Sequence, residues 1–197
     1  SDHGVIAIDN VLVDHDGKLI EDVGYFWDHA EQRNKIAHDY IIANYVCTTN
    51  KHYPLEFYRF VKQDQCQANG QDFVDHNEYV RWLVDWAVKM EIPGEITFDS
   101  YFTNAKTLNH INGLKRNYVG DLKFNRKIQF KGQEMRADEL ASQIASEDRK
   151  SIVIKGSRQY YFTVSVRIPE VDHKVRIVIL WRHKLDAQAC KILITNR

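Results

Sequence analysis

"EITFDSYFTN", residues 95–104, places three strand-forming residues directly before Asp99 and then leads into the helix-like run "NAKTLNHINGLK". A short polar side chain at such a junction is typical of a helix N-cap, and either Asp99 or Asn104 fits that role. The chain repeats the pattern, because "GVIAIDN", residues 4–10, reads as an apolar strand that ends on Asp9. Since local capping does not explain the repetition, we ask whether the two carboxylates serve one site.

The length and composition favour a globular protein without a membrane segment. The 197 residues suit one domain with an insertion and a sizeable core. No apolar run approaches the roughly 20 residues that cross a bilayer, and the N-terminus lacks a signal-peptide pattern. Three cysteines without close spacing are typical of reduced thiols in a cytosolic protein, with neither a zinc site nor a disulfide framework. They are Cys47, Cys66 and Cys190.

Charge is distributed unevenly along a chain whose net charge is zero. Residues 1–100 hold 8 Lys/Arg and 18 Asp/Glu, a net charge of −10, whereas residues 101–197 hold 19 and 9, a net charge of +10. The densest basic stretch is residues 113–136, where aromatic residues lie between the cations. Basic side chains follow phosphates and aromatic rings stack on bases, so this half could face a nucleic acid. A solvated hairpin with its aromatic rings in the core is the alternative.

Hydrophobic periodicity predicts a mixed α/β fold, in which helices pack on a sheet. The clearest helix spans residues 72–92, with Asp72 and Asp75 at its start and Pro93-Gly94 at its end. Residues 66–72 read as a loop. The other predicted helices are 104–115 and 136–150, and the predicted strands are 4–13, 22–29, 35–49, 52–62, 95–99 and 117–124, followed by a β-rich block from residue 151 with a hairpin around 170–173.

Sites in open α/β sheets form where strands end and side chains enter a crevice. If the strands of Asp9 and Asp99 are neighbours, their carboxylates converge there and repel each other unless a cation lies between them. Mg²⁺ prefers such hard oxygen ligands, and a metal pair could hold both oxygens of a phosphoryl transfer. The residues alone therefore predict an acidic metal site beside a basic C-terminal half.

Four segments together resemble the catalytic core of a bacterial insertion-sequence transposase. They are "GVIAIDN", "DHDGKLIEDVGYFWDHAEQRNKIAHDYIIANYV", "ITFDSYFTNAKTLNHI" and "RHKLDAQACKILITNR". The similar family is the RNase H-like DDE class, in the cut-and-paste branch with a β-rich insertion in the catalytic domain. The resemblance covers nearly the whole chain. It implies an RNase H-like core in residues 1–125, the insertion in residues 126–189, and a returning core strand in residues 190–197.

The resemblance makes Asp9 and Asp99 the first two catalytic, metal-binding carboxylates of a DDE triad. It places the third, a Glu on a later helix, beyond Arg197, so that this fragment is expected to be inactive alone. Relatives often carry a second Asp and a Thr after the first Asp, where this chain has Asn10 and Val11. If position 10 is the true ligand position, metal binding would be weak.

The implied function is Mg²⁺- or Mn²⁺-dependent cleavage and strand transfer at transposon ends. The implied partners are transposon-end and target DNA, and the resemblance is compatible with a homodimer in the DNA complex. The implied location is cytoplasmic and nucleoid-associated. Trp181, on an insertion strand, would either stack on a DNA base or pack within the hairpin sheet. The candidate phosphate contacts are Lys115, Arg116, Lys123, Arg126, Lys127 and Lys131.

Two other functions remain open from sequence. An inactive or domesticated DNA-binding module of the same fold is compatible with Asn10 and the missing Glu. A haloacid-dehalogenase-type phosphatase fits "IAIDNVLV" loosely but lacks the usual second Asp at Val11. Among other polar groups, the Asp16-Gly17 turn explains two of the three residues Asp14, His15 and Asp16 without a metal. Asp28-His29 and His38-Asp39 are ambiguous between surface groups and DNA or carboxylate contacts.

Overall fold

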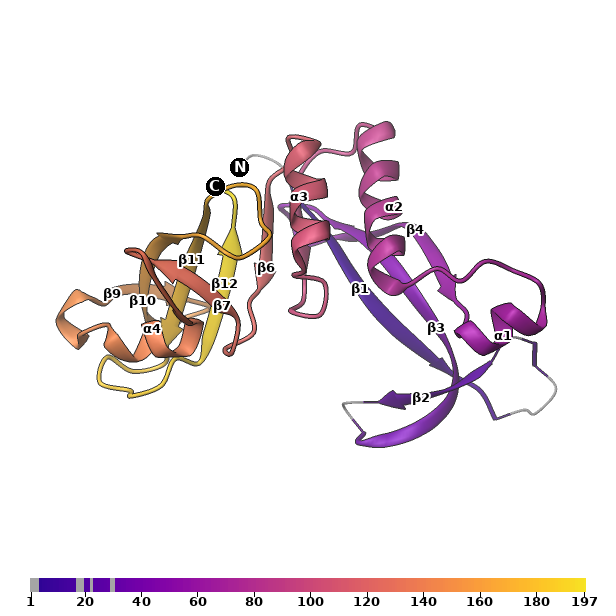
Figure 1. Cartoon of the computed structure of the whole chain (residues 1–197), viewed down its shortest axis with the longest axis horizontal. Coiled ribbons are helices and arrows are strands. Elements are labelled where there is room, and N and C mark those ends of the chain that lie inside the picture. The colour runs from indigo at the N-terminus through magenta and orange to yellow at the C-terminus, as the bar shows by residue number, and fades with distance from the viewer. Residues whose placement is uncertain (1–3, 17–19, 22, 29–30) are drawn as a thin grey trace. The chain divides into compact units, whose positions relative to one another are not determined.

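A computed structural model describes residues 4–16, 20–21, 23–28 and 31–197. The chain divides into two compact units, Ser1–Gly94 and Glu95–Arg197, which we describe one at a time (Figure 1). Both consist mainly of sheet with a few helices, so the predicted α/β class is confirmed. Among the described residues, no helix has the length and apolar character that crossing a membrane requires.

The first unit is built around one long strand. β3 (Arg33–Val46) pairs along one edge with β1 (Val5–Asp14), in an antiparallel register that joins Val5 to Val46 and Asp14 to Ala37. Its other edge pairs with β2 (Gly24–Asp28) over one half and with β4 (His52–Phe60) over the other half. β3 therefore receives a partner strand on both sides for most of its length.

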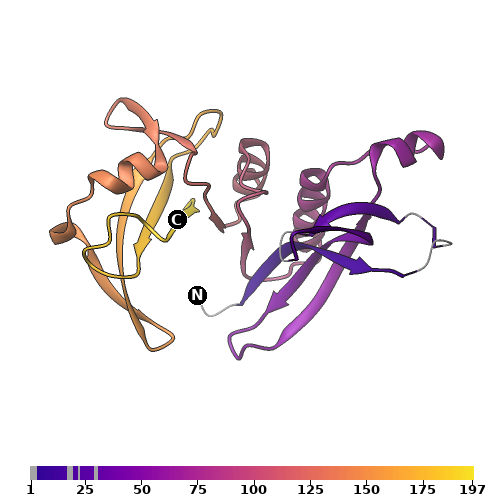
Figure 2. The same cartoon turned by 90° about the horizontal axis from the view of Figure 1, so that it is seen from below.

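Helix α2 (His76–Lys89) packs against β3 and β4 and forms the core of the first unit with them (Figures 1 and 2). The Asp75 side chain accepts a hydrogen bond from the Glu78 N–H at 2.9 Å, as expected of an N-cap. The apolar stripe of α2 is fully buried against sheet residues of alternating spacing. The buried side chains include Ile6, Ile8, Ile41, Ala43, Val80, Leu83, Val84 and Ala87.

Gly94, where the first unit ends, requires glycine for two reasons. Its φ of 113° lies in the region that side chains disfavour, and a Cβ there would lie 2.4 Å from the Gly4 carbonyl oxygen. The chain that leaves α2 therefore passes very close to the backbone that enters β1.

In the second unit, the strands of the main sheet follow the order β5-β6-β12-β11-β10-β9. β5 (Glu95–Phe98) and β6 (Tyr118–Asp121) are parallel and joined by helix α3 (Ala105–Gly113). The remaining neighbours are antiparallel. The strands of that antiparallel part are β9 (Lys150–Ile154), β10 (Ser157–Val166), β11 (Val175–Trp181) and β12 (Lys191–Thr195).

A small hairpin and a short helix complete the second unit. β7 (Lys127–Phe130) pairs with β8 (Gln133–Arg136), and α4 (Ala137–Gln143) follows directly. Gln129 of β7 also bridges to Arg167, which ties the hairpin to the end of β10. Ile128 is fully buried while its neighbours Lys127 and Gln129 are exposed, so the hairpin has one core face and one solvent face.

Three sequence-based expectations about elements are wrong in detail. Asp9 does not end its strand: β1 continues to Asp14, in agreement with the predicted strand 4–13, because β3 supplies hydrogen-bond partners beyond the point where burial stops. Residues 63–68, partly predicted as loop, form helix α1 (Gln63–Ala68). The helix predicted over 136–150 ends at Gln143, and a single 3₁₀ turn, Ser146–Asp148, follows. The division into residues 1–125, 126–189 and 190–197 stays a prediction.

Candidate functional site at the end of β5

The parallel pair β5–β6 brings two carboxylates to the same end of its two strands. The register pairs Phe98 with Gly120, so Asp99 and Asp121 are the next residues on neighbouring strands. Gly120 permits a close approach here, because a Cβ would lie 2.6 Å from the Phe98 ring and 2.8 Å from the Thr103 methyl group. The Thr103 hydroxyl donates to the carbonyl oxygens of Ser100 and Asp121, both at 2.8 Å, and so ties the segment after β5 to β6.

Asp99 is exposed and does not cap the helix that follows it. Its Oδ1 accepts a hydrogen bond from the Tyr101 N–H at 2.7 Å and closes a turn directly after β5. Asn104 is the N-cap of α3, since its Oδ1 accepts from the Thr107 N–H at 2.9 Å. Of the two residues that sequence offered for the cap, Asn104 therefore fills it. Asp99 keeps its second oxygen without a hydrogen bond from any described residue.

A pocket of about 500 Å³ opens next to this turn, within the second unit. Its wall begins at Ser100, directly after Asp99, and continues through the segment that follows β6. Three cations from that segment line it, together with one carboxylate from the loop after β10. The lining residues are Ser100, Tyr101, Thr103, Asn104, Leu122, Lys123, Asn125, Arg126, Lys127, Pro169 and Glu170, and we call this space the strand-end pocket.

The predicted DNA-binding cations fall into three places. Lys123, Arg126 and Lys127 line the strand-end pocket. Lys115 and Arg116 precede β6 and therefore lie toward the other end of that strand. Lys131 lines a separate pocket that also contains Arg167 and Lys174. Arg167 and Lys174 were not singled out from sequence, because each lies about 40 residues further along the chain, in or beside the β-rich block.

Trp181 is fully buried, and the Arg149 guanidinium lies 4.1 Å from the centre of its ring. Arg149 also donates to the carbonyl oxygens of Ile144, Lys184 and Asp186, at 2.8–3.1 Å. Of the two roles considered for Trp181 from sequence, stacking on a DNA base and packing within the sheet, this arrangement corresponds to packing. Its ring offers no face to a DNA base while Arg149 stays in place, so we leave Trp181 out of the proposed site.

Asp9 lies in the middle of β1 rather than at its end, paired with Ile42 of β3. Asp9 and its neighbour Asn10 are both exposed, and alternation along the strand directs them to opposite faces of the sheet. Asn10 is on the face of Ile6 and Ile8, and Asp9 is on the other. Asp9 belongs to the first unit and Asp99 to the second, so the expectation that their carboxylates share an ion stays a prediction.

Two buried polar residues of β3, His38 and Asp39, have partners inside the first unit. His38, buried beside β1, donates from Nε2 to the Glu21 carbonyl oxygen at 2.8 Å, and its Nδ1 lies 2.8 Å from His15 Nε2. Asp39, also buried, accepts from His76 Nε2 at 2.7 Å. His38 of β3 and His76 of α2 therefore both have hydrogen-bond partners within the first unit. Gly17 and His29, which sequence paired with Asp16 and Asp28, lie outside the described residues.

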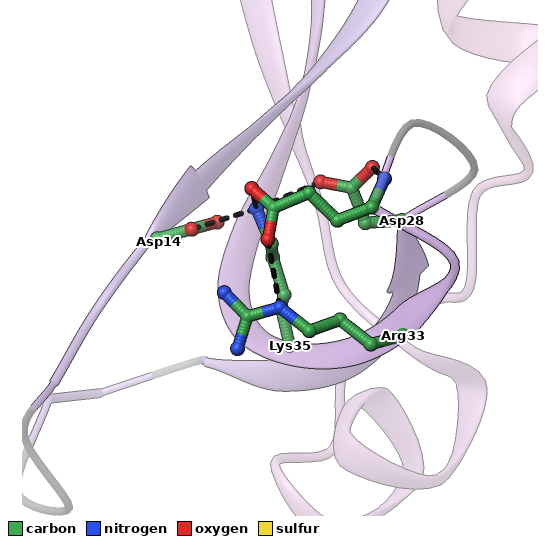
Figure 3. A network of polar contacts seen from close by, with 5 residues as sticks. Asp14, Asp28, Arg33 and Lys35 are labelled. Carbon is green, nitrogen blue, oxygen red and sulfur yellow. Dashed lines mark hydrogen bonds and ion pairs between the residues drawn. The ribbon is translucent and has the colours of Figure 1, made fainter.

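Lys35 is the centre of an ion-pair network in the first unit (Figure 3). Its Nζ lies 2.9 Å from Asp14, 2.8 Å from Asp28 and 2.5 Å from Glu31, and its side chain is only 8% exposed. Arg33 contacts the other oxygen of Glu31 at 2.7 Å. Hydrogen bonds to Asp28, Glu31 and Asp14 raise the pKa of Lys35, and hydrogen bonds from Lys35 and Arg33 lower the pKa of Glu31. The network explains Asp14 and Asp28 without a metal.

Replacing Lys35 with Met should lower the stability of the first unit near neutral pH, because three carboxylates lose their shared cation. The raised pKa of Lys35 implies stabilisation that is complete below 10.5 and lost as pH rises through the folded value. The lowered pKa of Glu31 implies stabilisation that is present above 4.5 and lost as pH falls through the folded value. The stability deficit of Lys35→Met should therefore shrink as the carboxylates are protonated.

Urea midpoints measured from pH 3 to pH 8 test this prediction. The exposed Lys51→Met is the matched control and should show little change, since the median exposed ion pair contributes about 0–1 kcal/mol. A deficit for Lys35→Met that does not depend on pH would mean that the methylene packing of Lys35, and not its charge, is what the network needs.

The loop of residues 168–173 is held in place by hydrogen bonds to α3 and β6. Asn109 of α3 donates from Nδ2 to the Glu170 carbonyl oxygen at 2.9 Å and accepts from the Asp172 N–H at 3.0 Å. His173 lies between Asp172 Oδ1, at 2.7 Å, and the hydroxyl of Tyr118, at 3.0 Å. Tyr118 is fully buried, and burial raises its pKa. The loop that places Glu170 in the pocket wall is thus anchored to the core of the second unit.

Within the described residues, no group of three or more His, Cys, Asp or Glu side chains is arranged to hold a metal ion.

Comparisons with known proteins identify no family for this chain. No model of a known protein family matches the chain. No curated protein is similar to it at a significant level. The functional argument therefore depends on the residues and on the geometry of each unit.

Proposed function

We propose that this chain is the catalytic core of a DNA transposase, which cleaves and transfers phosphodiester strands with the help of Mg²⁺ or Mn²⁺. One observation supports the proposal most: an exposed carboxylate, Asp99, directly precedes the wall of a pocket lined by Lys123, Arg126 and Lys127. Carboxylate oxygens suit a hard divalent cation, and clustered cations suit the phosphates of its substrate. We propose with it that the core has the RNase H-like arrangement and acts at the bacterial nucleoid.

The residues of the candidate site fit a metal-assisted phosphoryl transfer. Asp99 uses one oxygen to close its turn and leaves the other available as a ligand. Asp9, exposed on β1, is the second proposed ligand. A bound Mg²⁺ would act as a Lewis acid on the phosphate and would activate a water or a DNA 3′-hydroxyl. The part of the protein is to fix the two carboxylates and to hold the phosphate in line.

The division of charge between the units agrees with this assignment of roles. Residues 1–94 hold 8 Lys/Arg and 16 Asp/Glu, a net charge of −8, and residues 95–197 hold 19 and 11, a net charge of +8. Lys127 is 70% exposed and pairs with Glu134 at 2.9 Å, a surface contact that a DNA phosphate can replace at little cost. Arg126 is half-buried, and its planar guanidinium suits a two-pronged phosphate contact.

The test is whether this chain binds and breaks duplex DNA in a metal-dependent way. Because only two proposed metal ligands, Asp9 and Asp99, lie in this chain, we expect binding that is strengthened by Mg²⁺ or Mn²⁺ but no nicking by the chain alone, and we expect Asp99→Asn to lose the effect of the metal. A small phosphomonoester should not be hydrolysed. Hydrolysis of the phosphomonoester would instead support the phosphatase, and metal-independent DNA binding without cleavage would support the inactive DNA-binding module.

A further inference from the structure

A carboxylate such as that of Glu170 would be unfavourable in a pocket that bound only phosphate. The strand-end pocket contains three cations, and a negative charge among them weakens their attraction for a phosphate. Among the described residues, Glu170 nevertheless forms no ion pair with any of the three. Glu170 is an exposed residue of the pocket wall, and its carboxylate accepts no hydrogen bond from the described part of the chain.

The backbone holds Glu170 in this position at an energetic cost. Its φ is 67°, in the left-handed region that favours Gly or Asn. A residue in this conformation is retained where contacts with its surroundings fix the backbone, and such residues are common at functional sites. Here the surroundings are the two hydrogen bonds of Asn109 to the 168–173 loop, at 2.9 and 3.0 Å, and the contact of His173 with Tyr118. The carboxylate is therefore presented by a rigid support rather than by a loose loop.

Two other polar side chains of the pocket wall are already used by the fold. Thr103 donates to two carbonyl oxygens, and both ends of the Asn104 side chain serve the start of α3. Among the described pocket-lining residues, Glu170 supplies the one carboxylate, and this acceptor stays available for a ligand, as does the exposed amide of Asn125. A suitable ligand has a phosphate for the cations and an N–H donor for the carboxylate. A nucleotide in DNA has both.

We propose that Glu170 determines sequence specificity by accepting a hydrogen bond from the N4 amino group of a cytosine, while Lys123, Arg126 and Lys127 bind the adjoining phosphates. This inference rests on the proposed DNA-binding function and adds a base preference to it. Phosphate contacts position DNA without reading sequence, whereas a carboxylate distinguishes cytosine from bases that offer only acceptors at that edge. Asn109 is a positioning residue, because it orients the loop that carries Glu170.

The experiment measures the affinity of wild type and Glu170→Gln for a panel of duplexes in which each base pair is varied in turn. Wild type should prefer cytosine at one position by about tenfold. A glutamine amide pairs with adenine N6 and N7, so the variant should lose that preference and gain one for adenine at the same position. Glu147→Gln, an exposed carboxylate outside the pocket, should keep the wild-type preference.

A second variant, Asn109→Ala, releases the loop without altering the carboxylate. It should weaken the preference at the same position and leave the salt dependence of binding unchanged. If Glu170→Gln alters affinity equally for all sequences, or not at all, Glu170 does not read a base and the inference fails while DNA binding stands. If wild type shows no affinity for DNA, the proposed function and this inference fail together.

Discussion

Replacing Asp99 with Asn should remove divalent-metal binding from the chain and abolish any metal-dependent attack on DNA. The amide keeps the oxygen that accepts from the Tyr101 N–H, so the turn after β5 is retained and only the charge is lost. Even residues that merely orient metal ligands change affinity by roughly 10–100-fold, so loss of a direct ligand should lower Mn²⁺ affinity at least as much. Titration with Mn²⁺, followed by electron paramagnetic resonance, measures this loss.

Asp9→Asn should have the same effect if the two carboxylates share an ion. Iron-mediated cleavage gives an independent readout, because Fe²⁺ bound in place of Mg²⁺ cuts the polypeptide near its ligands. Cuts near residues 9 and 99 in wild type, both absent from either variant, are expected. Asn10→Asp should raise affinity if position 10, on the opposite face of the sheet from Asp9, is the true ligand position. Asp148→Asn, an exposed carboxylate of the 3₁₀ turn, is the control. Normal Mn²⁺ binding by Asp99→Asn would remove Asp99 from the site.

Elements with a strong local signal were predictable from the sequence. Helix α2 has an apolar stripe, an Asp75 cap and a Pro93-Gly94 end, and all three signals act within the segment itself. The hairpins of the β-rich block also follow from alternation and turn residues. Helix α1 was missed because it has only six residues, with Asn69 and Gly70 immediately after it, and because its single buried side chain is Cys66.

Features that depend on distant partners were not predictable. The predicted strand 4–13 matches β1 to within one residue at each end, but the pairing of its mostly exposed second half with β3 did not follow from the sequence. At the candidate site, the sequence offered Asp99 and Asn104 equally as caps, and only the fold shows that Asn104 fills the role. Glu170 read as an ordinary hairpin residue, because Asn109, which fixes its loop, is 61 residues away in the chain.

Replacing Arg126 and Lys127 with Ala should weaken DNA binding by about tenfold or more at low salt and make it less sensitive to salt. Both residues line the strand-end pocket beside Asp99, one half-buried and one exposed. Each phosphate that a cation neutralises contributes about −0.9 to the slope of log affinity against log salt. If each residue contacts one phosphate, the slope should become shallower by about 1.8. Because phosphate contacts carry no sequence information, the loss should be similar for every duplex.

Lys150→Ala with Arg158→Ala is the matched control, since it removes two exposed cations from the β9–β10 hairpin and leaves the pocket intact. This control should keep most of the affinity and a nearly wild-type slope, because general attraction depends only weakly on two distant charges at physiological salt. Equal losses in both double variants would mean that DNA senses the net charge of the second unit and not the pocket. Unchanged affinity and slope in Arg126→Ala/Lys127→Ala would place the DNA path away from β5, and Asp99 would then lack a phosphate to act on.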